Sequence, residues 1–295
     1  MEFGNKKKAL IKVGYKCNNS CKFCWVEAYG RKGHDSTTQE IFEKIKIAKQ
    51  IGAEMVVLSG GEPTIRNDLF KILSFIKKQG MSLGLGTNGR MFSSDRFFNK
   101  IKKYNLEYVQ VSFHSYDKLV HNEVTKTSSG FEQTTAGIKK LIGAGIPVIV
   151  NIVVTSNNLK DLNMTLDCLK SLGVICVRMS VIEPMSDSTL VPSLKEVIIK
   201  VNEAMHYGLN LKMNVYYSAL PRCKMVFSDR YCDLYEMGFK WLSESFESKF
   251  FCIDTPDKFN RLDLCKGCAN KECFGIYKRY FNFMSDEDRE FIRDH

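Results

Sequence analysis

The sequence lacks the features of membrane, secreted and repetitive proteins. No apolar stretch reaches the roughly 20 residues that a membrane-spanning helix needs, so we expect no membrane partner. The first eight residues, Met-Glu-Phe-Gly-Asn-Lys-Lys-Lys, contain no apolar signal-peptide core, which argues against secretion. Internal repeats and low-complexity segments are also missing, and an aromatic content of 12% with mixed charges argues against disorder. These absences predict a soluble cytoplasmic protein, and its 295 residues are enough to bury a large core.

The charge balance is basic. Lys and Arg exceed Asp and Glu by ten (43 − 33), which favours an anionic partner such as a nucleotide, a nucleic acid or an acidic peptide. The basic residues are spread along the chain, with no dense run beyond Lys6 to Lys8. Most of them are therefore interpreted as solvated helix faces, and binding of nucleic acid stays open.

Eleven cysteines are the most informative part of the composition. An odd number without a signal peptide argues against a disulfide framework and favours metal or redox chemistry. Nine of the eleven lie in residues 17–24 and 223–273. The other two, Cys168 and Cys176, stand in apolar surroundings and are interpreted as buried packing residues.

The first 180 residues alternate between strand-like and helix-like patterns. Strands are predicted near residues 9–15, 54–59, 81–87, 108–114, 148–155 and 174–181. Helices are predicted between them, near residues 38–51, 67–79, 93–104, 131–143 and 159–172. This alternation indicates an α/β protein with a parallel sheet covered by helices. Six such units predict a partial (β/α)6 TIM-type barrel with ligands at the C-terminal ends of the strands.

The last 110 residues follow a different pattern. Pro184, Pro192 and the polar stretch between them mark a linker. A helix near residues 194–207 and a strand near residues 211–217 follow, and the rest is irregular and rich in cysteine. We therefore predict two parts. These are a barrel over residues 1–185 and a small cysteine-rich C-terminal extension over residues 186–295, which bound metal would stabilise.

A cysteine motif follows the first predicted strand. Residues 15–25 read Tyr-Lys-Cys-Asn-Asn-Ser-Cys-Lys-Phe-Cys-Trp, so the spacing C-x3-C-x2-C joins Cys17, Cys21 and Cys24 in one loop. Three thiolates at this spacing can bind three irons of a [4Fe–4S] cubane and leave the fourth iron open to a small molecule. The alternative is a structural zinc site with His34 as fourth ligand, which would not account for the motifs that follow.

The loop resembles the signature of the radical S-adenosylmethionine (SAM) superfamily, C-x3-C-x-aromatic-C, with Phe23 in the aromatic position. In this family a Gly-Gly-Glu motif binds the amino group of the methionine moiety, which implies that Gly60, Gly61 and Glu62 contact the cofactor. The resemblance also implies cofactor contacts from later strands, at Thr87, Ser112, Asn151 and Arg178. Arg178 would equally suit a substrate, because an arginine within an apolar strand needs a partner.

The resemblance covers about residues 9–182 and implies a reaction. One electron delivered to the cluster cleaves SAM into methionine and a 5′-deoxyadenosyl radical, which takes a hydrogen atom from the substrate. An external reductant of the flavodoxin or ferredoxin type would supply the electron. No residue is assigned as a catalytic acid or base. His114 and His121 are interpreted as hydrogen-bonded structural residues rather than proton carriers.

A second group of cysteines lies near the C-terminus. Cys265, Cys268 and Cys273 have the spacing C-x2-C-x4-C, and Cys223 follows a predicted strand and a proline. These four are the predicted ligands of one further metal centre. Two other cysteines are spare candidates, Cys232 and Cys252. The arrangement resembles the SPASM and twitch regions of radical SAM enzymes, which implies one auxiliary [4Fe–4S] cluster. A structural zinc knuckle is the alternative, because four cysteines bind zinc equally well.

Three functions are open from the sequence alone. The main expectation is modification of a peptide or protein side chain, which the auxiliary region favours, with a separate partner to recognise a leader. The second is radical chemistry on a small metabolite or nucleotide, where the basic excess and Arg178 would meet phosphate. The third is a non-enzymatic, metal-stabilised binding module, which the complete cysteine motif argues against.

Overall fold

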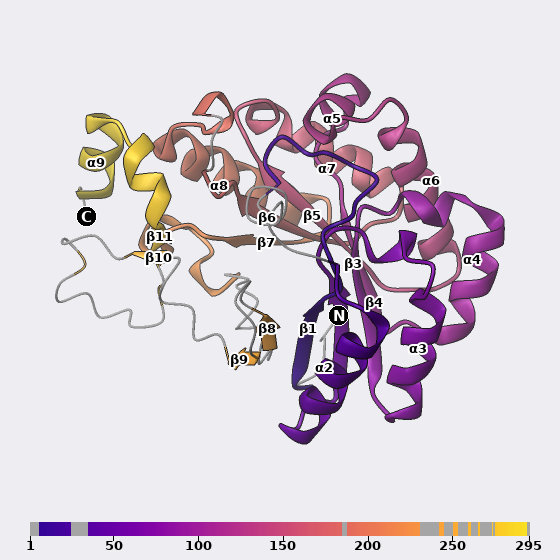
Figure 1. Cartoon of the computed structure of the whole chain (residues 1–295). Helices are drawn as coiled ribbons and strands as arrows, with labels where there is room; N and C mark the ends of the chain where they lie inside the picture. The colour runs from indigo at the N-terminus through magenta and orange to yellow at the C-terminus, as the bar shows by residue number, and fades with distance from the viewer. Residues whose placement is uncertain are drawn as a thin grey trace.

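Seven parallel strands form the central sheet of the computed structural model, in the order β1 to β7 (Figure 1). The structure describes residues 6–24, 35–184, 188–230, 242–244, 250–252, 259–260, 265, 273 and 275–293. The strands are β1 (Lys8–Lys12), β2 (Met55–Ser59), β3 (Ser82–Thr87), β4 (Tyr108–Ser112), β5 (Val148–Val154), β6 (Cys176–Val181) and β7 (Asn214–Ser218). Sequential parallel strands need crossover connections, and helices supply them.

Helices connect the successive strands. They are α2 (Thr38–Gln50), α3 (Leu69–Lys78), α4 (Asp95–Ile101), α5 (Lys118–Thr125), α6 (Gly130–Gly143), α7 (Leu162–Ser171) and α8 (Leu194–Asn210). Local signals set their starts: Thr37 and Glu40 form a capping box at α2, and the Ser193 hydroxyl caps α8. Gly80 and Gly173 follow α3 and α7 with φ of 72° and 87°, a backbone conformation that favours glycine and ends a helix.

The two faces of the sheet differ in what covers them. On one face, fully buried residues such as Val56, Leu83 and Val109 pack against the helices in the main hydrophobic core. The other face, here called the inner face, carries a smaller apolar cluster of buried residues: Met55, Val57, Tyr108, Ile149 and Cys176. Because strand residues alternate between faces, the inner face also receives the polar residues nearer the C-terminal strand ends.

The predicted α/β class and parallel barrel-like sheet are confirmed, and the sheet has one strand more than the six expected. The strand predicted near residues 211–217 is β7, which pairs in parallel with β6, Arg178 opposite Tyr216 and Ser180 opposite Ser218. Helix α8 provides the crossover that returns the chain to the same sheet edge. Helix α5 is the other difference, since no helix was predicted there.

The C-terminal segment is fastened to the start of α8. Helix α9 (Asp286–Arg293) lies beside α8 (Figure 1). The buried Asp288 carboxylate accepts hydrogen bonds from the Ser193 hydroxyl at 2.7 Å and the Lys195 N–H at 2.8 Å. The Tyr280 hydroxyl donates to the Pro192 carbonyl at 2.6 Å. Short antiparallel pairs precede this segment: β8 (Leu242–Glu244) with β9 (Phe250–Cys252), and β10 (Phe259–Asn260) with β11 (Ile276–Tyr277). The boundary expected after residue 185 stays a prediction.

Candidate active site

The loop with the first three cysteines follows β1 and rests on the C-terminal end of α5. The Ser20 N–H donates to the Thr125 carbonyl at 3.2 Å, and the Lys22 N–H donates to the Val124 carbonyl at 2.9 Å. The Lys22 ammonium also pairs with the Glu123 carboxylate at 2.6 Å. The last carbonyls of a helix lack intrahelical donors, so the loop and the helix end satisfy one another.

A second set of contacts joins the loop to the end of β3. The Asn88 side-chain amide donates to the Asn18 Oδ1 at 2.6 Å and lies 3.8 Å from the Cys17 sulfur. The Arg90 guanidinium donates to the Asn18 carbonyl and, at 2.8 Å, to the Asn19 Oδ1. Sequence analysis missed Asn88 and Arg90. The predicted Thr87 pointed to this strand end, but the partners of Asn88 and Arg90 lie about 70 residues away in the chain.

The three thiols form a cluster of their own. Cys17 is exposed, and Cys21 and Cys24 are half-buried. Burial, together with the neighbouring thiols of Cys24 and Cys17, raises the pKa of the Cys21 thiol to about 12. Within the described residues, no three Cys, His, Asp or Glu side chains converge on a single metal ion. A cubane instead gives each thiolate its own iron, so this set fits a [4Fe–4S] cluster. The alternative zinc ligand, His34, lies outside the described residues.

Glu62 is the most enclosed charged group at the site, with 2% of its surface exposed. Its Oε1 accepts from the Thr64 N–H at 3.0 Å, the Thr64 hydroxyl at 2.5 Å and the Thr87 hydroxyl at 2.7 Å. Its Oε2 accepts from the Asn88 N–H at 2.7 Å. Burial raises the pKa of Glu62, and these hydrogen bonds oppose the rise. Glu62 therefore ties the ends of β2 and β3 together, and its contact with SAM stays a prediction.

Gly60 and Gly61 let the cysteine loop pack directly against the end of β2. The Gly61 N–H donates to the Gly14 carbonyl at 2.7 Å, and the Glu62 N–H donates to the Lys16 carbonyl at 2.8 Å. A Cβ at Gly60 (φ 122°) would lie 2.6 Å from the Gly14 carbonyl oxygen, and one at Gly61 would overlap the Lys16 carbonyl. In the described structure, the close approach that needs glycine is to the protein's own chain.

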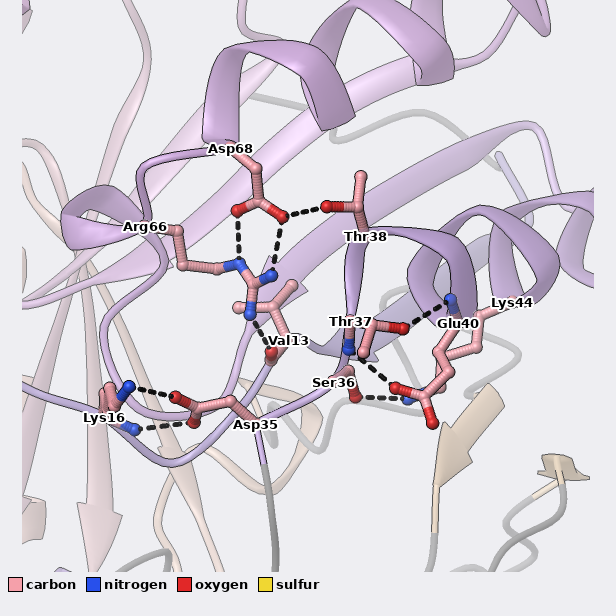
Figure 2. Close-up of polar contacts among 10 residues, drawn as sticks. All are labelled: Val13, Lys16, Asp35, Ser36, Thr37, Thr38, Glu40, Lys44, Arg66 and Asp68. Atoms are coloured by element: carbon pink, nitrogen blue, oxygen red, sulfur yellow. Dashed lines mark hydrogen bonds and ion pairs between the residues drawn. The ribbon is translucent and has the colours of Figure 1, made fainter.

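Two ion pairs line a cavity of about 340 Å³ behind this turn. Figure 2 shows the Arg66 guanidinium pointing at Asp68, with Nε and NH2 donating at 2.9 and 2.7 Å. The Arg66 NH1 donates to the Val13 carbonyl at 2.6 Å. Lys16 and Asp35 lie 3.4 Å apart on the other wall (Figure 2). The Arg66–Val13 hydrogen bond and the Lys16–Asp35 ion pair join segments distant in sequence, and they hold the start of the cysteine loop in place.

The predicted residues of β4 to β6 lie side by side on the inner face. Ser112 is opposite Asn151, which is opposite Arg178. The Asn151 Oδ1 accepts from the Ser180 hydroxyl at 2.8 Å, and the Ser180 hydroxyl accepts from Ser218 at 3.1 Å. Ser180 and Ser218 were not predicted as site residues, because only the parallel register of β6 and β7 brings them together.

The guanidinium group of Arg178 is only partly hydrogen-bonded within the described residues. Its NH2 donates to the Ser218 hydroxyl at 3.2 Å. Its Nε is buried and has no hydrogen-bond partner among the residues that the structure describes. Buried polar groups are rarely left unpaired, so this nitrogen marks a place where a ligand acceptor would fit.

Phe23 contacts the histidine pair beneath the loop. Its ring meets the His114 ring edge-on at 4.8 Å between centroids. The Nδ1 of His114 accepts from the Val153 N–H at 3.2 Å, and that of His121 accepts from the His114 N–H at 3.3 Å. Both rings are buried, and burial lowers the pKa of His121 to about 4 and that of His114 well below its usual value. They are neutral, hydrogen-bonded structural residues, as interpreted from the sequence.

The second cysteine group is described in part. The Arg222 N–H lies 3.4 Å from the Cys273 sulfur, which brings Cys273 next to the residue that precedes Cys223. Cys265 is half-buried. Cys268 and Cys232 lie outside the described residues, and only the backbone of Cys252 is described. The auxiliary cluster stays a prediction.

Comparison with known protein families identifies the family of the region that contains the first cysteine loop. Residues 11–169 match the family described as the Radical SAM superfamily. The chain belongs to the radical SAM superfamily. Membership confirms the expected class of iron–sulfur proteins, and the family implies a [4Fe–4S] cluster and SAM. Among the described helices, none has the length and apolar character to cross a bilayer.

Curated relatives carry a nucleotide-related name. The chain is 33% identical over 175 residues to a probable GTP 3′,8-cyclase of Sulfurisphaera tokodaii, covering 58% of this chain and 55% of the relative. It is 32% identical over 175 residues to a probable GTP 3′,8-cyclase of Methanococcus aeolicus, covering 57% of each. The match thus spans little more than half the length of these relatives.

Solved structures show the same fold. Streptococcus suis SuiB bound to S-adenosylmethionine has a TM-score of 0.60 at 16% identity, covering 72% of this chain and 50% of that one. AnSMEcpe with bound AdoMet has a TM-score of 0.58 at 15% identity, covering 68% and 60%. SuiB has also been solved with its precursor peptide SuiA. At sequence identities of 15–16%, these comparisons show similarity of fold alone.

Proposed function

We propose that this chain is a radical SAM enzyme that acts on a small phosphorylated molecule, with a nucleotide as the best-supported substrate. The observation that carries the proposal is the charge of the sheet. None of its seven strands contains Asp or Glu. Its inner face carries two basic residues toward the C-terminal half of their strands, Lys12 and Arg178, and a third, Lys8, at the opposite end of β1 over the Tyr108 ring. Positively charged side chains attract anionic ligands such as phosphates.

Arg178 is the residue we assign to a substrate phosphate. It stands on β6, three strands from Thr87 on β3, which corresponds to roughly 14 Å at about 4.8 Å per strand. The cysteine loop and Glu62 lie at the side of the sheet formed by β1, β2 and β3, so a second ligand would bind at the opposite side, formed by β6 and β7. Arginine binds phosphate oxygens through several parallel N–H donors. Among the described residues, none accepts a hydrogen bond from the Arg178 Nε.

The relatives support a nucleotide more than a peptide. Both are named for a reaction of GTP, whereas the likeness to SuiB is a likeness of fold at 16% identity. The peptide interpretation, our main expectation from sequence, therefore gives way to the alternative.

The chain's residues would divide the work between the two ends of the sheet. SAM bound to a reduced cluster would supply a radical that takes a hydrogen atom from the substrate. Cys17, Cys21 and Cys24 would hold the cluster, and Glu62 would orient the methionine amino group. The apolar cluster of the inner face, which includes Met55 and Tyr108, would keep water from the reacting atoms.

The test uses anaerobically reconstituted protein with a chemical reductant. Formation of 5′-deoxyadenosine from SAM is measured with GTP, with guanosine and with an acidic peptide. We expect GTP to stimulate cleavage about tenfold or more over guanosine, because a charge-assisted hydrogen bond contributes about 1.5–3 kcal/mol. Equal stimulation by guanosine would remove the phosphate from the proposal, and stimulation by the peptide alone would restore the first interpretation.

We also propose that Cys223, Cys265, Cys268 and Cys273 hold an auxiliary [4Fe–4S] cluster. The proximity of Arg222 to the Cys273 sulfur supports the pairing of Cys223 with the later cysteines. Iron and zinc are counted on the same reconstituted protein. About eight irons per chain would support two cubanes, and about four irons with one zinc would contradict the second cluster.

A further inference from the structure

Arg90 donates hydrogen bonds to the cysteine loop immediately after Cys17. Its NH1 donates both to the Asn18 carbonyl and to the Asn19 Oδ1, the latter at 2.8 Å. Asn18 and Asn19 follow Cys17 directly in the chain and precede Cys21. The two acceptors therefore hold the segment that sets the spacing between the first two thiols.

Two further hydrogen bonds hold Arg90 in its orientation. Its Nε donates to the Gln133 Oε1 of α6 at 2.7 Å. Its backbone N–H donates to the Asn88 Oδ1 at 3.1 Å. Helix α6 packs closely here, because Gly137 abuts the Gly89 carbonyl and leaves no space for a Cβ. Arg90 is thus a preorganised donor rather than a side chain that finds its partner by chance.

The charge of Arg90 is the second part of the observation. The lysines of the loop are neutralised, Lys22 by Glu123 at 2.6 Å and Lys16 by Asp35 at 3.4 Å. Within the described part of the chain, Arg90 has amide and carbonyl acceptors and no carboxylate at ion-pair distance. A positive charge without a counter-ion therefore lies against the loop.

We propose that Arg90 is a positioning residue that clamps the cysteine loop and that its charge stabilises the reduced cluster. A cubane with three thiolates is anionic, and reduction adds a further negative charge. A nearby cation favours the more negative state, and charge and hydrogen bonding near the cysteines set cluster potentials. The proposal concerns the cluster and not the substrate, so it goes beyond the proposed function.

The clamp is tested on the apoprotein by hydrogen exchange with mass spectrometry. The measured peptide covers residues 15–24, whose Ser20 and Lys22 amides bond to α5. In Arg90→Met we expect these amides to exchange about tenfold or more faster, since a charged hydrogen bond to the loop is lost. The matched control is Lys140→Met, which removes another cation that joins α6 to the segment after β3, through Ser93 and Asp95.

The charge is tested on reconstituted protein by a redox titration followed by electron paramagnetic resonance. Arg90→Met should shift the midpoint potential of the cluster to a more negative value, and Arg90→Lys should restore it toward wild type. Gln133→Leu should loosen the loop while leaving the potential close to wild type, because the charge remains. Gln133→Leu and Arg90→Lys keep both tests informative if Arg90→Met does not fold.

Each part has an outcome that overturns it. Exchange in Arg90→Met equal to that in Lys140→Met would overturn the clamp. An unchanged midpoint potential in Arg90→Met, or an equal shift in Arg90→Lys, would overturn the role of the charge. Neither readout uses a substrate, so failure here is distinguishable from failure of the nucleotide proposal.

Discussion

The two ends of the sheet differ in how completely their polar groups are paired. At the β2–β3 end, the buried Glu62 carboxylate accepts four hydrogen bonds from Thr64, Thr87 and Asn88. At the β6–β7 end, Arg178 donates to one hydroxyl and has a buried nitrogen without a partner in the described part of the chain. The hydrogen bonds of the β2–β3 end are formed without a ligand, whereas the β6–β7 end has a donor available for a ligand.

This difference has a physical reason. Burying a carboxylate costs free energy unless hydrogen-bond donors surround it. The protein itself must therefore supply hydrogen-bond partners for the polar groups near the cysteine loop, so that the loop keeps its geometry. A ligand-binding donor that the protein satisfied fully would have nothing left to offer. We therefore expect substitutions at the first end to affect folding and cofactor binding, and those at the second to affect the substrate.

The largest effect is expected from Cys24→Ala. Loss of one of three thiolate ligands should abolish reductive cleavage of SAM and remove about four irons per chain. Cleavage is measured by chromatography of 5′-deoxyadenosine and iron by chemical assay. Cys168→Ala, a half-buried thiol on α7, is the control and should retain both. Continued cleavage of SAM in Cys24→Ala would refute the radical assignment.

Glu62→Gln tests the fully paired end. The amide nitrogen of glutamine would face an N–H or hydroxyl donor, so a buried donor loses its acceptor. We expect a loss of about 3 kcal/mol in the free energy of unfolding of the apoprotein, measured with urea. The control is Glu43→Gln, whose side chain is 50% exposed, and it should change little. Equal free energies of unfolding for Glu62→Gln and Glu43→Gln would contradict the claim that the hydrogen bonds of Glu62 stabilise the β2–β3 end.

Arg178→Met tests the open end. We expect the Kd of GTP, measured by calorimetry on reconstituted protein, to rise about 10- to 100-fold, because charge-assisted contacts to phosphate are lost. Arg96→Met, an exposed arginine on α4, is the control for net charge. If the Kd of SAM rises instead and that of GTP does not, Arg178 belongs to the cofactor end.

At pH 7 the smallest effect is expected from His121→Asn on α5, whose influence on stability emerges only as the pH falls. Burial lowers the pKa of His121 to about 4, and the unfolded value is about 6.5. Between these values the unfolded state binds more protons, so His121 makes the protein less stable as pH falls from about 6.5 to about 4. The shift corresponds to about 3 kcal/mol.

Urea unfolding at pH 7 and pH 4.5 measures this loss. The asparagine Oδ1 can accept the hydrogen bond that the His121 Nδ1 accepts from the His114 N–H, so His121→Asn should lose less stability over that range than wild type. His206→Asn, an exposed histidine on α8, should behave like wild type. Identical pH dependence in His121→Asn would show that His121 is not buried in its neutral form.

Most of the sheet was predictable because its strands are apolar runs bounded by turn residues. Helix α5 was not, since its eight residues, Lys118–Thr125, are too short for a clear apolar period. Its stability comes from tertiary contacts, such as Phe113 against His121 and the cysteine loop on its last carbonyls. The strand of residues 214–218 was expected, but pairing with β6 depends on the path of α8.

Local patterns in the sequence were sufficient to predict the residues that hold the cluster and the cofactor. The three cysteines and the Gly-Gly-Glu turn are local patterns, and their order on successive strands indicated the superfamily. The hydrogen-bond partners of these side chains depend on contacts between distant segments and were not predictable from local patterns. The bonds from Arg90 to Asn19, from Thr87 to Glu62 and from Arg178 to Ser218 span 71, 25 and 40 residues. Sequence periodicity indicates which face of a strand is buried, but strand register and helix packing set which buried groups meet.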